Sequence, residues 1–549
     1  MAGAGDLQHK PPGMLISDRN LVQFLVEAER DFPRRAAVWS ERGALNYQQL
    51  LQEVRAMAGL LQAWGVQPGD RVFLLLPNWP QFVIACEAIW WVGGVAALSS
   101  PLIPAPLLIE QLRKARPRIV ITSNRLDATL AQSIRDLGVE RIILSSGREY
   151  MRTQVGWLFR GPKPKTSMPG GVHRWRACMR EAVASETPYP EGGERAAALI
   201  FSGGTTGAPK GVVLSHRALW ANTMQLAGWD ELMQRGKERL LAALPLGHAY
   251  GLTGVLNLGM HKAGTLILSS SLKPDHLADL SSRFHPTLFP GTPALYAALL
   301  NLPNLRSYNF KSIRLCACGS APLPVEVQEG FERVTRAQVI EGFGLTEAGP
   351  ITHCSPPGGM RKQGSVGLPL ALTESRILSL STGLPLPAGE IGELVVRGPQ
   401  LMTGYWEEPE ATAEALRDGW LHTGDLGVTD SDGYTYLLGR MTDCCKVGEN
   451  LVYPRRIEEV IHLHPSVQEV AVLGWPAGFP RDLKGIGLVD KLHAFVVPRP
   501  GKKVSVDELR QYVQVRLPDW LRPELWTLLP QLPRTPFGKV SRLSLYGSY

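Results

Sequence analysis

Short apolar runs alternate with amphipathic stretches along the first half of the chain. The apolar runs are four to six residues long, as is usual for buried strands. They lie at 71–76, 119–122, 141–144, 197–201, 241–244 and 265–268. Apolar residues recur three and four positions apart in Ala44–Trp64, before the first run, and similar patterns lie between most of the runs, which predicts amphipathic helices. Buried strands that alternate with helices predict an α/β domain with mostly parallel sheets flanked by helices.

The most apolar long segment is Phe82–Leu98, and it could be mistaken for a membrane span. It contains the ionisable Glu87 and is interrupted by Gly93 and Gly94. A span needs about 20 apolar residues without such interruptions. We therefore predict a buried helix followed by a buried strand.

The pattern changes after Gly389, where strands such as ELVVR and YTYLL alternate like strands with one exposed face. Expected strands lie at 393–397, 434–438, 469–473 and 492–497, and a helix at 506–516. A chain of 549 residues exceeds what one hydrophobic core usually supports. We predict a large N-terminal domain at 1–439 and a small α+β domain at 440–549.

Charge and cysteine content argue against several kinds of partner and site. The net charge is +8, and no run of five basic residues occurs, which argues against a nucleic-acid partner. The seven cysteines are an odd number without a Cys-x-x-Cys pair, so neither a zinc site nor a disulfide framework is expected. The first residues lack the apolar stretch of a signal peptide, and together these features predict a cytoplasmic protein.

Residues 149–180 interrupt the alternation with a segment rich in proline, glycine and basic residues, among them GWLFRGPKPKTSMPGG. One interpretation is a surface excursion. The other is a basic and aromatic patch at the entrance for an acyl substrate or in peripheral contact with a membrane.

The strongest local signal is FSGGTTGAPKG, at 201–211, which follows one apolar run and precedes another. Its glycines allow close approach of backbone N–H groups to a phosphate, and its hydroxyls and lysine add donors and positive charge. Pro209 stands where a Walker loop has glycine, so the segment is a different kind of phosphate loop. The candidate ligands of the nucleotide here are Ser202, Gly203, Gly204, Thr205, Thr206, Gly207 and Lys210.

Further segments follow in a definite order. They are GFGLTE at 342–347, WLHTGDLG at 420–427, Gly439-Arg440, Gly448-Glu449-Asn450 with Pro454, and PRTPFGK at 533–539. With the phosphate loop, they resemble the motifs of the adenylate-forming superfamily, which includes acyl- and aryl-CoA synthetases, peptide-synthetase adenylation domains and beetle luciferases. The chain looks most similar to bacterial fatty acyl-CoA ligases.

The resemblance implies ATP, Mg²⁺ and coenzyme A as reactants or cofactors. It also implies that the domain at 1–439 binds ATP and the acid and that the small domain at 440–549 is mobile. It assigns contact with the α-phosphate to Thr346 and a Mg²⁺ ligand to Glu347, whose carboxylate oxygens suit that hard cation. It also makes Lys539 the cation that bridges the substrate carboxylate and the α-phosphate, where developing charge needs stabilisation.

Other residues are carried over by position. Adenine would pack against Gly319, Ser320, Ala321 and Pro322, and Phe343 takes the place of the usual stacking aromatic, often tyrosine; Gly342 and Gly344 on either side are also predicted to bind the cofactor. Asp425 would accept hydrogen bonds from the ribose hydroxyls, with Arg440 close by, although a Thr-Gly-Asp sequence alone is also typical of a turn. Lys446, Gly448 and Glu449 complete the predicted cofactor-binding residues.

His248 resembles the histidine that lines the acyl site in this superfamily; the simpler interpretation is a structural histidine in a turn. No acidic residue that could bind a substrate amine occurs at Ala249, Tyr250 or Gly251. A neutral, apolar carboxylic acid is therefore favoured over an amino acid.

We thus predict an AMP-forming acid–thiol ligase that converts a medium- or long-chain fatty acid to acyl-AMP and then to acyl-CoA. Two alternatives remain: transfer to the phosphopantetheine of an acyl carrier protein, and a non-catalytic binder of acyl nucleotides. The second is motivated by a departure from the pattern. Thr442 stands where the superfamily usually has Asp or Lys at the hinge, and the stretch from Arg440 to Asn450 is one position shorter than usual.

Overall fold

The computed structural model describes residues 16–41, 43–124, 126, 128–150, 171–202, 209–447, 450–475, 487–489, 491–534 and 540–547. Contacts along the chain divide it into two compact units. The first comprises 1–202, 209–374 and 397–421, and the second comprises 203–208, 375–396 and 422–549. Some of the predicted site residues lie outside the described part of the chain: Gly203, Gly204, Thr205, Thr206, Gly207, Gly448, Glu449 and Lys539. Residues 151–170, which make up most of the 149–180 segment, also lie outside it.

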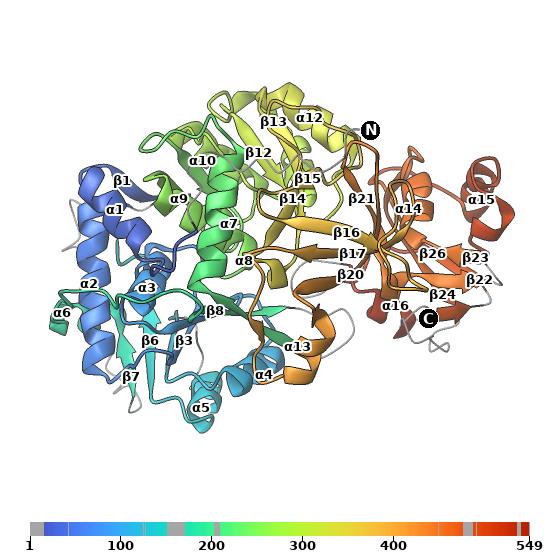
Figure 1. Ribbon diagram of the computed structural model, residues 1–549. Helices are drawn as coiled ribbons and strands as arrows, with labels where there is room; N and C mark the ends of the chain where they lie inside the picture. The colour runs from blue at the N-terminus through green and yellow to red at the C-terminus, as the bar shows by residue number, and fades with distance from the viewer. Residues whose placement is uncertain are drawn as a thin grey trace, which may run out of the picture. The chain divides into compact units, whose positions relative to one another are not determined.

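The first unit contains an eight-stranded sheet in the order β18-β9-β8-β4-β3-β5-β6-β7. Figure 1 labels four of these strands, β3, β6, β7 and β8. The six strands from β8 to β7 are parallel, and only β9 and β18 run against their neighbours. Their bounds are β3 Arg71–Leu75, β4 Val95–Leu98, β5 Ile119–Ser123, β6 Arg141–Ser145, β7 Val172–Arg174, β8 Ala196–Ser202, β9 Lys210–Ser215 and β18 Gly404–Tyr405.

A second sheet in this unit is formed by two four-stranded parts, β2-β1-β11-β10 and β12-β13-β14-β15. Parallel bridges at Leu288 and Gly291 join the two parts. The bounds are β1 Ala36–Ser40, β2 Gly43–Asn46, β10 Arg239–Ala242, β11 Thr265–Leu268, β12 Leu315–Cys318, β13 Gln338–Gly344, β14 Ile351–Cys354 and β15 Leu368–Pro369. From β1 to β13 the strands are parallel, so their carboxyl ends share one edge of the sheet.

Helices flank these sheets, and the predicted α/β architecture is confirmed. The longer ones are α1 Gln23–Asp31, α2 Tyr47–Ala63, α3 Pro80–Trp91, α4 Ala105–Ala115, α5 Ala128–Asp136, α7 His216–Trp229, α10 Pro274–Phe284, α11 Pro293–Leu300 and α12 Val325–Thr335. Every residue of α3 is buried, and β4 follows it, as predicted for 82–98. Among the described residues, no helix has both the length and the apolar character to cross a membrane.

Several element boundaries differ from the prediction by one to three residues. The helix expected from Ala44 begins at Tyr47, because Asn46 and Gln49 form a reciprocal capping box and the preceding residues pair in β2. The strand expected at 241–244 lies at Arg239–Ala242.

In the second unit, β17 (Gly392–Arg397) lies between β16 (Glu374–Leu378) and β20 (Trp420–Thr429), and β21 (Thr435–Arg440) pairs with β20. Two three-stranded sheets follow, in the orders β23-β22-β25 and β24-β26-β27. Helices α14 (Pro454–His462) and α15 (Val506–Gln514) bury their apolar residues with these strands in a separate core. The strand bounds are β22 Cys445–Val447, β23 Asn450–Val452, β24 Val467–Trp475, β25 Gly487–Val489, β26 Lys491–Pro498 and β27 Leu525–Leu528.

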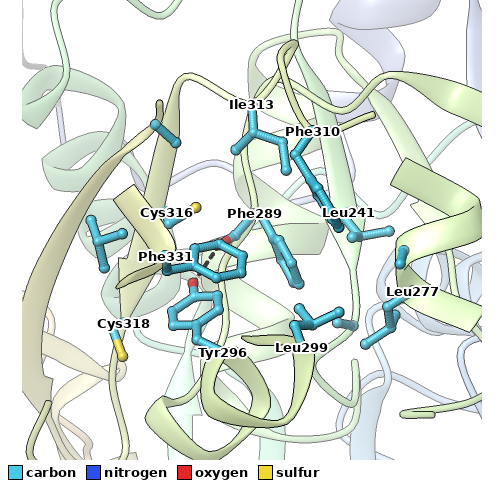
Figure 2. Close-up of a cluster of buried hydrophobic side chains, with 14 of the residues drawn as sticks. Leu241, Leu277, Phe289, Tyr296, Leu299, Phe310, Ile313, Cys316, Cys318 and Phe331 are labelled. Atoms are coloured by element: carbon cyan, nitrogen blue, oxygen red, sulfur yellow. Dashed lines mark hydrogen bonds between the residues drawn. The ribbon is translucent and has the colours of Figure 1, made fainter. Parts of the chain in front are cut away.

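One core of the first unit includes Cys316 and Cys318 of β12 together with aromatic side chains from neighbouring segments (Figure 2). Phe331 and Tyr296 pack with ring centroids 4.7 Å apart, and Phe289 meets Tyr296 edge-on at 5.4 Å. The Tyr296 hydroxyl lies 2.6 Å from the Phe289 carbonyl oxygen and 3.1 Å from that of Ala317. The aromatic cluster therefore has its polar group satisfied and fixes the backbone at the end of β12.

All seven cysteines are buried, and none forms a disulfide. Burial raises the pKa of each thiol above its ordinary value. No cluster of three or more metal-binding side chains occurs among the described residues. The cysteines therefore contribute to the packing of the cores.

Candidate active site

Lys210, Tyr405 and Glu347 meet in the first unit, although they lie far apart in sequence. Strand β18 pairs with β9, which places Tyr405 opposite Val212. The Lys210 Nζ lies 4.7 Å from the centroid of the Tyr405 ring, and the Tyr405 hydroxyl donates to Glu347 Oε1 at 3.0 Å. The predicted phosphate-binding lysine and the predicted Mg²⁺ ligand are thus linked through one tyrosine. Ser202, the last residue of β8, is the register partner of Lys210.

Thr346 and Glu347 lie in a 3-10 turn, Thr346–Ala348, which ends at Gly349. Gly349 has a φ of 77°, and a Cβ there would lie 2.6 Å from the Gln400 carbonyl oxygen. The Gly349 carbonyl accepts a hydrogen bond from Thr253 at 2.8 Å, and the Glu347 carbonyl accepts one from the Met402 N–H at 2.8 Å. Neighbouring segments therefore fix the turn from both sides.

The segments predicted to contact adenine follow two adjacent parallel strands. Gly319–Pro322 begins where β12 ends, and Gly342–Gly344 forms the end of β13. Carboxyl ends of parallel strands are where ligands bind in open α/β sheets. Ser320 has a φ of 74°, an uncommon conformation for a residue with a side chain, and Ser320, Ala321 and Pro322 are exposed. The Phe343 ring is half-buried.

His248 precedes helix α8 (Ala249–Gly251), and its Nδ1 accepts a hydrogen bond from the Tyr250 N–H at 3.2 Å. The chain continues as a π-helix over Leu252–Asn257, a rare element that is frequent at functional sites. The Tyr250 hydroxyl donates to the Ala317 carbonyl at 2.9 Å. A Cβ on Gly319 would lie 3.2 Å from the Tyr250 ring. The histidine segment is therefore packed against the end of β12.

Asp425 and Arg440 face each other in the second unit. They are register partners on β20 and β21, and Arg440 Nε lies 3.0 Å from Asp425 Oδ1. Arg440 also donates to the Thr423 carbonyl at 2.6 Å, and the Thr423 hydroxyl donates to the Leu394 carbonyl. The pairing that the sequence led us to expect is present. Lys446 lies on β22 in the same unit.

Three residues with a part in this geometry were not anticipated. Tyr405 carries the contact between Lys210 and Glu347, and the buried Asn78 and Asn222 bond to the loops of His248 and Glu347. An isolated asparagine or tyrosine gives no periodic signal, so only the folded arrangement reveals these contacts.

The model of the AMP-binding enzyme family matches residues 25–406, and that of the AMP-binding enzyme C-terminal domain matches residues 456–539. The chain belongs to the family of AMP-binding enzymes. The resemblance to adenylate-forming enzymes and the prediction of an AMP-forming acid–thiol ligase are thereby confirmed.

Named relatives extend over nearly the whole chain. A long-chain-fatty-acid–CoA ligase of Bacillus subtilis is 35% identical over 98% of this chain and 96% of its own length. A feruloyl-CoA synthase of Amycolatopsis is 33% identical, with coverage of 96% and 98%. An ATP-bound MatB from Rhodopseudomonas palustris superposes with a TM-score of 0.83 at 27% identity, with coverage of 96% and 98%. An anthranilate–CoA ligase in complex with anthranoyl-AMP has a TM-score of 0.84 at 25% identity, with coverage of 96% and 97%.

Proposed function

We propose that this enzyme activates a medium- or long-chain fatty acid with ATP to give acyl-AMP and pyrophosphate, and then transfers the acyl group to coenzyme A. The observation that carries the proposal is the contact of Lys210, Tyr405 and Glu347. It brings a cation and a carboxylate of two predicted phosphate-site motifs to one place. The fatty-acid ligases among the relatives support the choice of acid.

In this proposal the residues divide the chemistry between them. Lys210 and the glycine-rich loop bind the phosphates, and Thr346 contacts the α-phosphate, which must be aligned with an anionic carboxylate. Glu347 would bind Mg²⁺; its side chain is half-buried and its Oε1 already accepts a hydrogen bond, a setting that suits a hard cation. Lys539 would stabilise the charge that develops as the substrate carboxylate attacks.

The remaining assignments follow the same scheme. Asp425, oriented by Arg440, would bind the ribose hydroxyls. Gly319–Pro322 and Gly342–Gly344 would enclose the adenine, and His248 would line the acyl site. The small domain, which we place from Arg440 onward, would rotate between the two half-reactions, and Lys446, Gly448 and Glu449 would contact coenzyme A.

An aromatic acid is a second candidate substrate, because relatives include a feruloyl-CoA synthase and structural neighbours include an anthranilate–CoA ligase. Acyl transfer to a carrier protein is the alternative for the second step.

Pyrophosphate exchange with palmitate, octanoate, ferulate, phenylalanine and acetate separates the substrates. We expect the fatty acids to exceed phenylalanine and acetate by about tenfold or more, since an apolar pocket discriminates through lost methylene contacts. Fastest exchange with ferulate would establish the aromatic alternative, and a preference for phenylalanine would contradict both. Thioester formation with coenzyme A and with a phosphopantetheine-loaded carrier protein, measured side by side, identifies the acceptor.

A further inference from the structure

Asn222 lies in the middle of α7 and is completely buried. Its Nδ2 donates to the Ile351 carbonyl at 2.7 Å, and its Oδ1 accepts from the Ile351 N–H at 3.0 Å. Ile351 is the second residue after Gly349, where the Thr346–Ala348 turn ends. One side chain thus bonds both backbone groups of the residue at which the chain leaves the turn.

Gln225 and Gln400 extend this contact. Asn222 Nδ2 lies 2.8 Å from Gln225 Oε1, and Gln225 Nε2 lies 3.2 Å from Gln400 Oε1. Both glutamines are completely buried and also bond to the Thr373 hydroxyl. Gln400 begins the segment that brings the Met402 N–H to the turn and the Tyr405 hydroxyl to Glu347.

Asn78 makes a similar set of bonds on the other side of the site. It follows β3 and is 7% exposed. Its Nδ2 donates to the carbonyls of Ala242 and Leu244, each at 2.8 Å, and its Oδ1 accepts from the Leu246 N–H at 2.9 Å. These bonds fix the loop between β10 and His248.

An asparagine side chain offers two donor hydrogens and one acceptor oxygen. It can therefore pair with backbone C=O and N–H groups that have no partner within an irregular loop. An apolar side chain of the same size would leave buried N–H and C=O groups without partners. The loops would then relax, and the functional side chains would move. Displacements of about 1 Å in such sites can lower rates by about a hundredfold.

We propose that Asn222 and Asn78 are positioning residues, each for one half of the active site. Asn222, with Gln225 and Gln400, sets the Thr346–Glu347 turn for Mg²⁺ and ATP. Asn78 sets the His248 loop for the carboxylic acid. The inference rests on the proposed function, because it uses that function's division of the site into a nucleotide side and an acyl side.

The test compares Asn222→Leu and Asn78→Leu with Asn20→Leu. Asn20 is also completely buried and bonds the Trp90 carbonyl at 2.7 Å and the Val22 N–H at 3.1 Å, but it contacts neither loop. All three variants should lower the melting temperature to a similar extent. The steady-state constants for ATP, Mg²⁺ and palmitate should separate them.

We expect Asn222→Leu to raise the KM for ATP and the Mg²⁺ requirement about tenfold, with the palmitate KM within about twofold. Asn78→Leu should raise the KM for palmitate about tenfold and leave the KM for ATP and the Mg²⁺ requirement within about twofold. Asn20→Leu should change none of these constants. Equal effects of the first two variants on all three constants, or an Asn20→Leu profile like either of them, would overturn the proposal.

If a leucine variant does not fold, the serine variants Asn222→Ser and Asn78→Ser retain one hydrogen-bonding group and should show the same pattern at smaller size. Calorimetric titration with ATP and Mg²⁺ gives the nucleotide readout independently of any acid. A wild-type enzyme without exchange on fatty acids would refute the proposed substrate. Unaltered nucleotide affinity in the Asn222 variants would refute the positioning role.

Discussion

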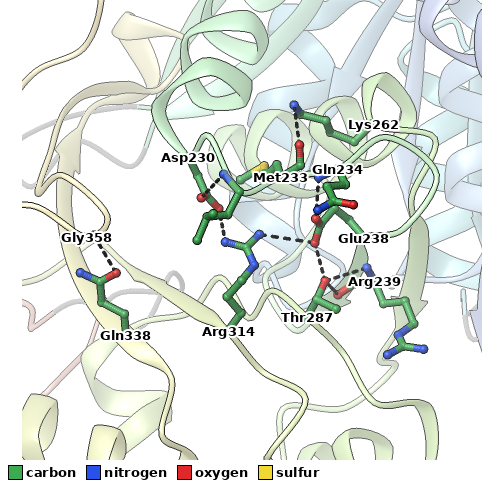
Figure 3. A network of polar contacts seen from close by, with 11 residues as sticks. Asp230, Met233, Gln234, Glu238, Arg239, Lys262, Thr287, Arg314, Gln338 and Gly358 are labelled. Atoms are coloured by element: carbon green, nitrogen blue, oxygen red, sulfur yellow. Dashed lines mark hydrogen bonds and ion pairs between the residues drawn. The ribbon is translucent and has the colours of Figure 1, made fainter.

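Each unit of the protein contains an arginine that bridges two carboxylates, and the two clusters differ in where they lie relative to the chemistry. In the first unit Arg314 pairs with Asp230 and Glu238, whose side chains are only 2% and 5% exposed (Figure 3). In the second unit Arg542 pairs with Glu458 at 2.8 Å and with Asp443 at 3.3 Å.

The Arg314 cluster lies at the edge of the sheet opposite to the site. Arg314 directly precedes β12, and Glu238 directly precedes β10. Thr287, which donates to Glu238 at 2.6 Å, precedes the bridge residue Leu288. The amino ends of parallel strands are thus joined there, whereas the predicted adenine segments follow the carboxyl ends.

The Arg542 cluster connects parts of the chain that the proposed mechanism uses. Asp443 is three residues after Arg440, and Arg542 is three residues after Lys539. Glu458 accepts from the Val472 N–H at 2.8 Å, which adds β24 to the group. The same ionic chemistry therefore supports the fold in one unit. In the other it joins Asp443, which follows the proposed hinge residue Thr442, to the segment after the proposed catalytic Lys539.

The largest expected effect is that of Arg314→Met. Removing the cation leaves two buried carboxylates without their partner, which should cost about 3–5 kcal/mol in the free energy of unfolding. Urea unfolding followed by tryptophan fluorescence measures it, and KM values of the folded fraction should be unchanged. Arg116→Met is the matched control, since Arg116 and Glu407 form an exposed pair whose loss should cost at most about 1 kcal/mol. A changed KM for ATP in Arg314→Met would remove the distinction between the clusters.

Arg542→Met should lower the free energy of unfolding less, by about 2 kcal/mol, because the carboxylates that lose their partner are more exposed. Glu458 and Asp443 are 17% and 27% exposed, against 2% and 5% for Asp230 and Glu238. It should lower pyrophosphate exchange about tenfold, because the segment that carries Lys539 loses its bond to Asp443. Arg510→Met, at an exposed pair of the same unit, is the control. Pyrophosphate exchange at the wild-type rate in Arg542→Met would show that the Arg542 cluster, like the Arg314 cluster, only supports the fold.

Glu87 provides the most specific test, because it is a buried carboxyl whose Oε2 has no hydrogen-bond partner among the described residues. Burial raises the pKa of Glu87 from 4.5 to about 8. The folded state therefore keeps its proton while the unfolded state loses it, and Glu87 lowers stability progressively as the pH rises from 4.5 to about 8.

Glu87→Gln removes this dependence. The difference in unfolding free energy between variant and wild type should grow in favour of the variant by at most about 1.4 kcal/mol per pH unit. It should level off above the folded pKa. Unfolding at a series of pH values measures the slope, and a constant difference would mean that Glu87 is ionised in the fold.

The sequence was sufficient for the parallel strands and for the family, because apolar runs and glycine-rich motifs carry their signal locally. It was insufficient where a distant residue decides the outcome. Ala243 and Leu244 continue the apolar run of β10, yet Asn78 bonds the Ala242 and Leu244 carbonyls and the strand ends at Ala242. Tyr405 reaches Glu347 only because β18 pairs with β9, a contact between residues almost two hundred positions apart.

The buried cysteines make the native protein ready for site-specific labelling. Maleimides and similar reagents react with the thiolate form of cysteine. The seven native thiols are buried and have raised pKa values, so they provide almost no thiolate for this reaction. Cysteines introduced at exposed positions, such as Arg113 in the first unit and Lys502 in the second, would be the reactive ones. A dye pair attached there could follow the separation of the two units in real time as ATP, the acid and coenzyme A are added, with every native cysteine left in place.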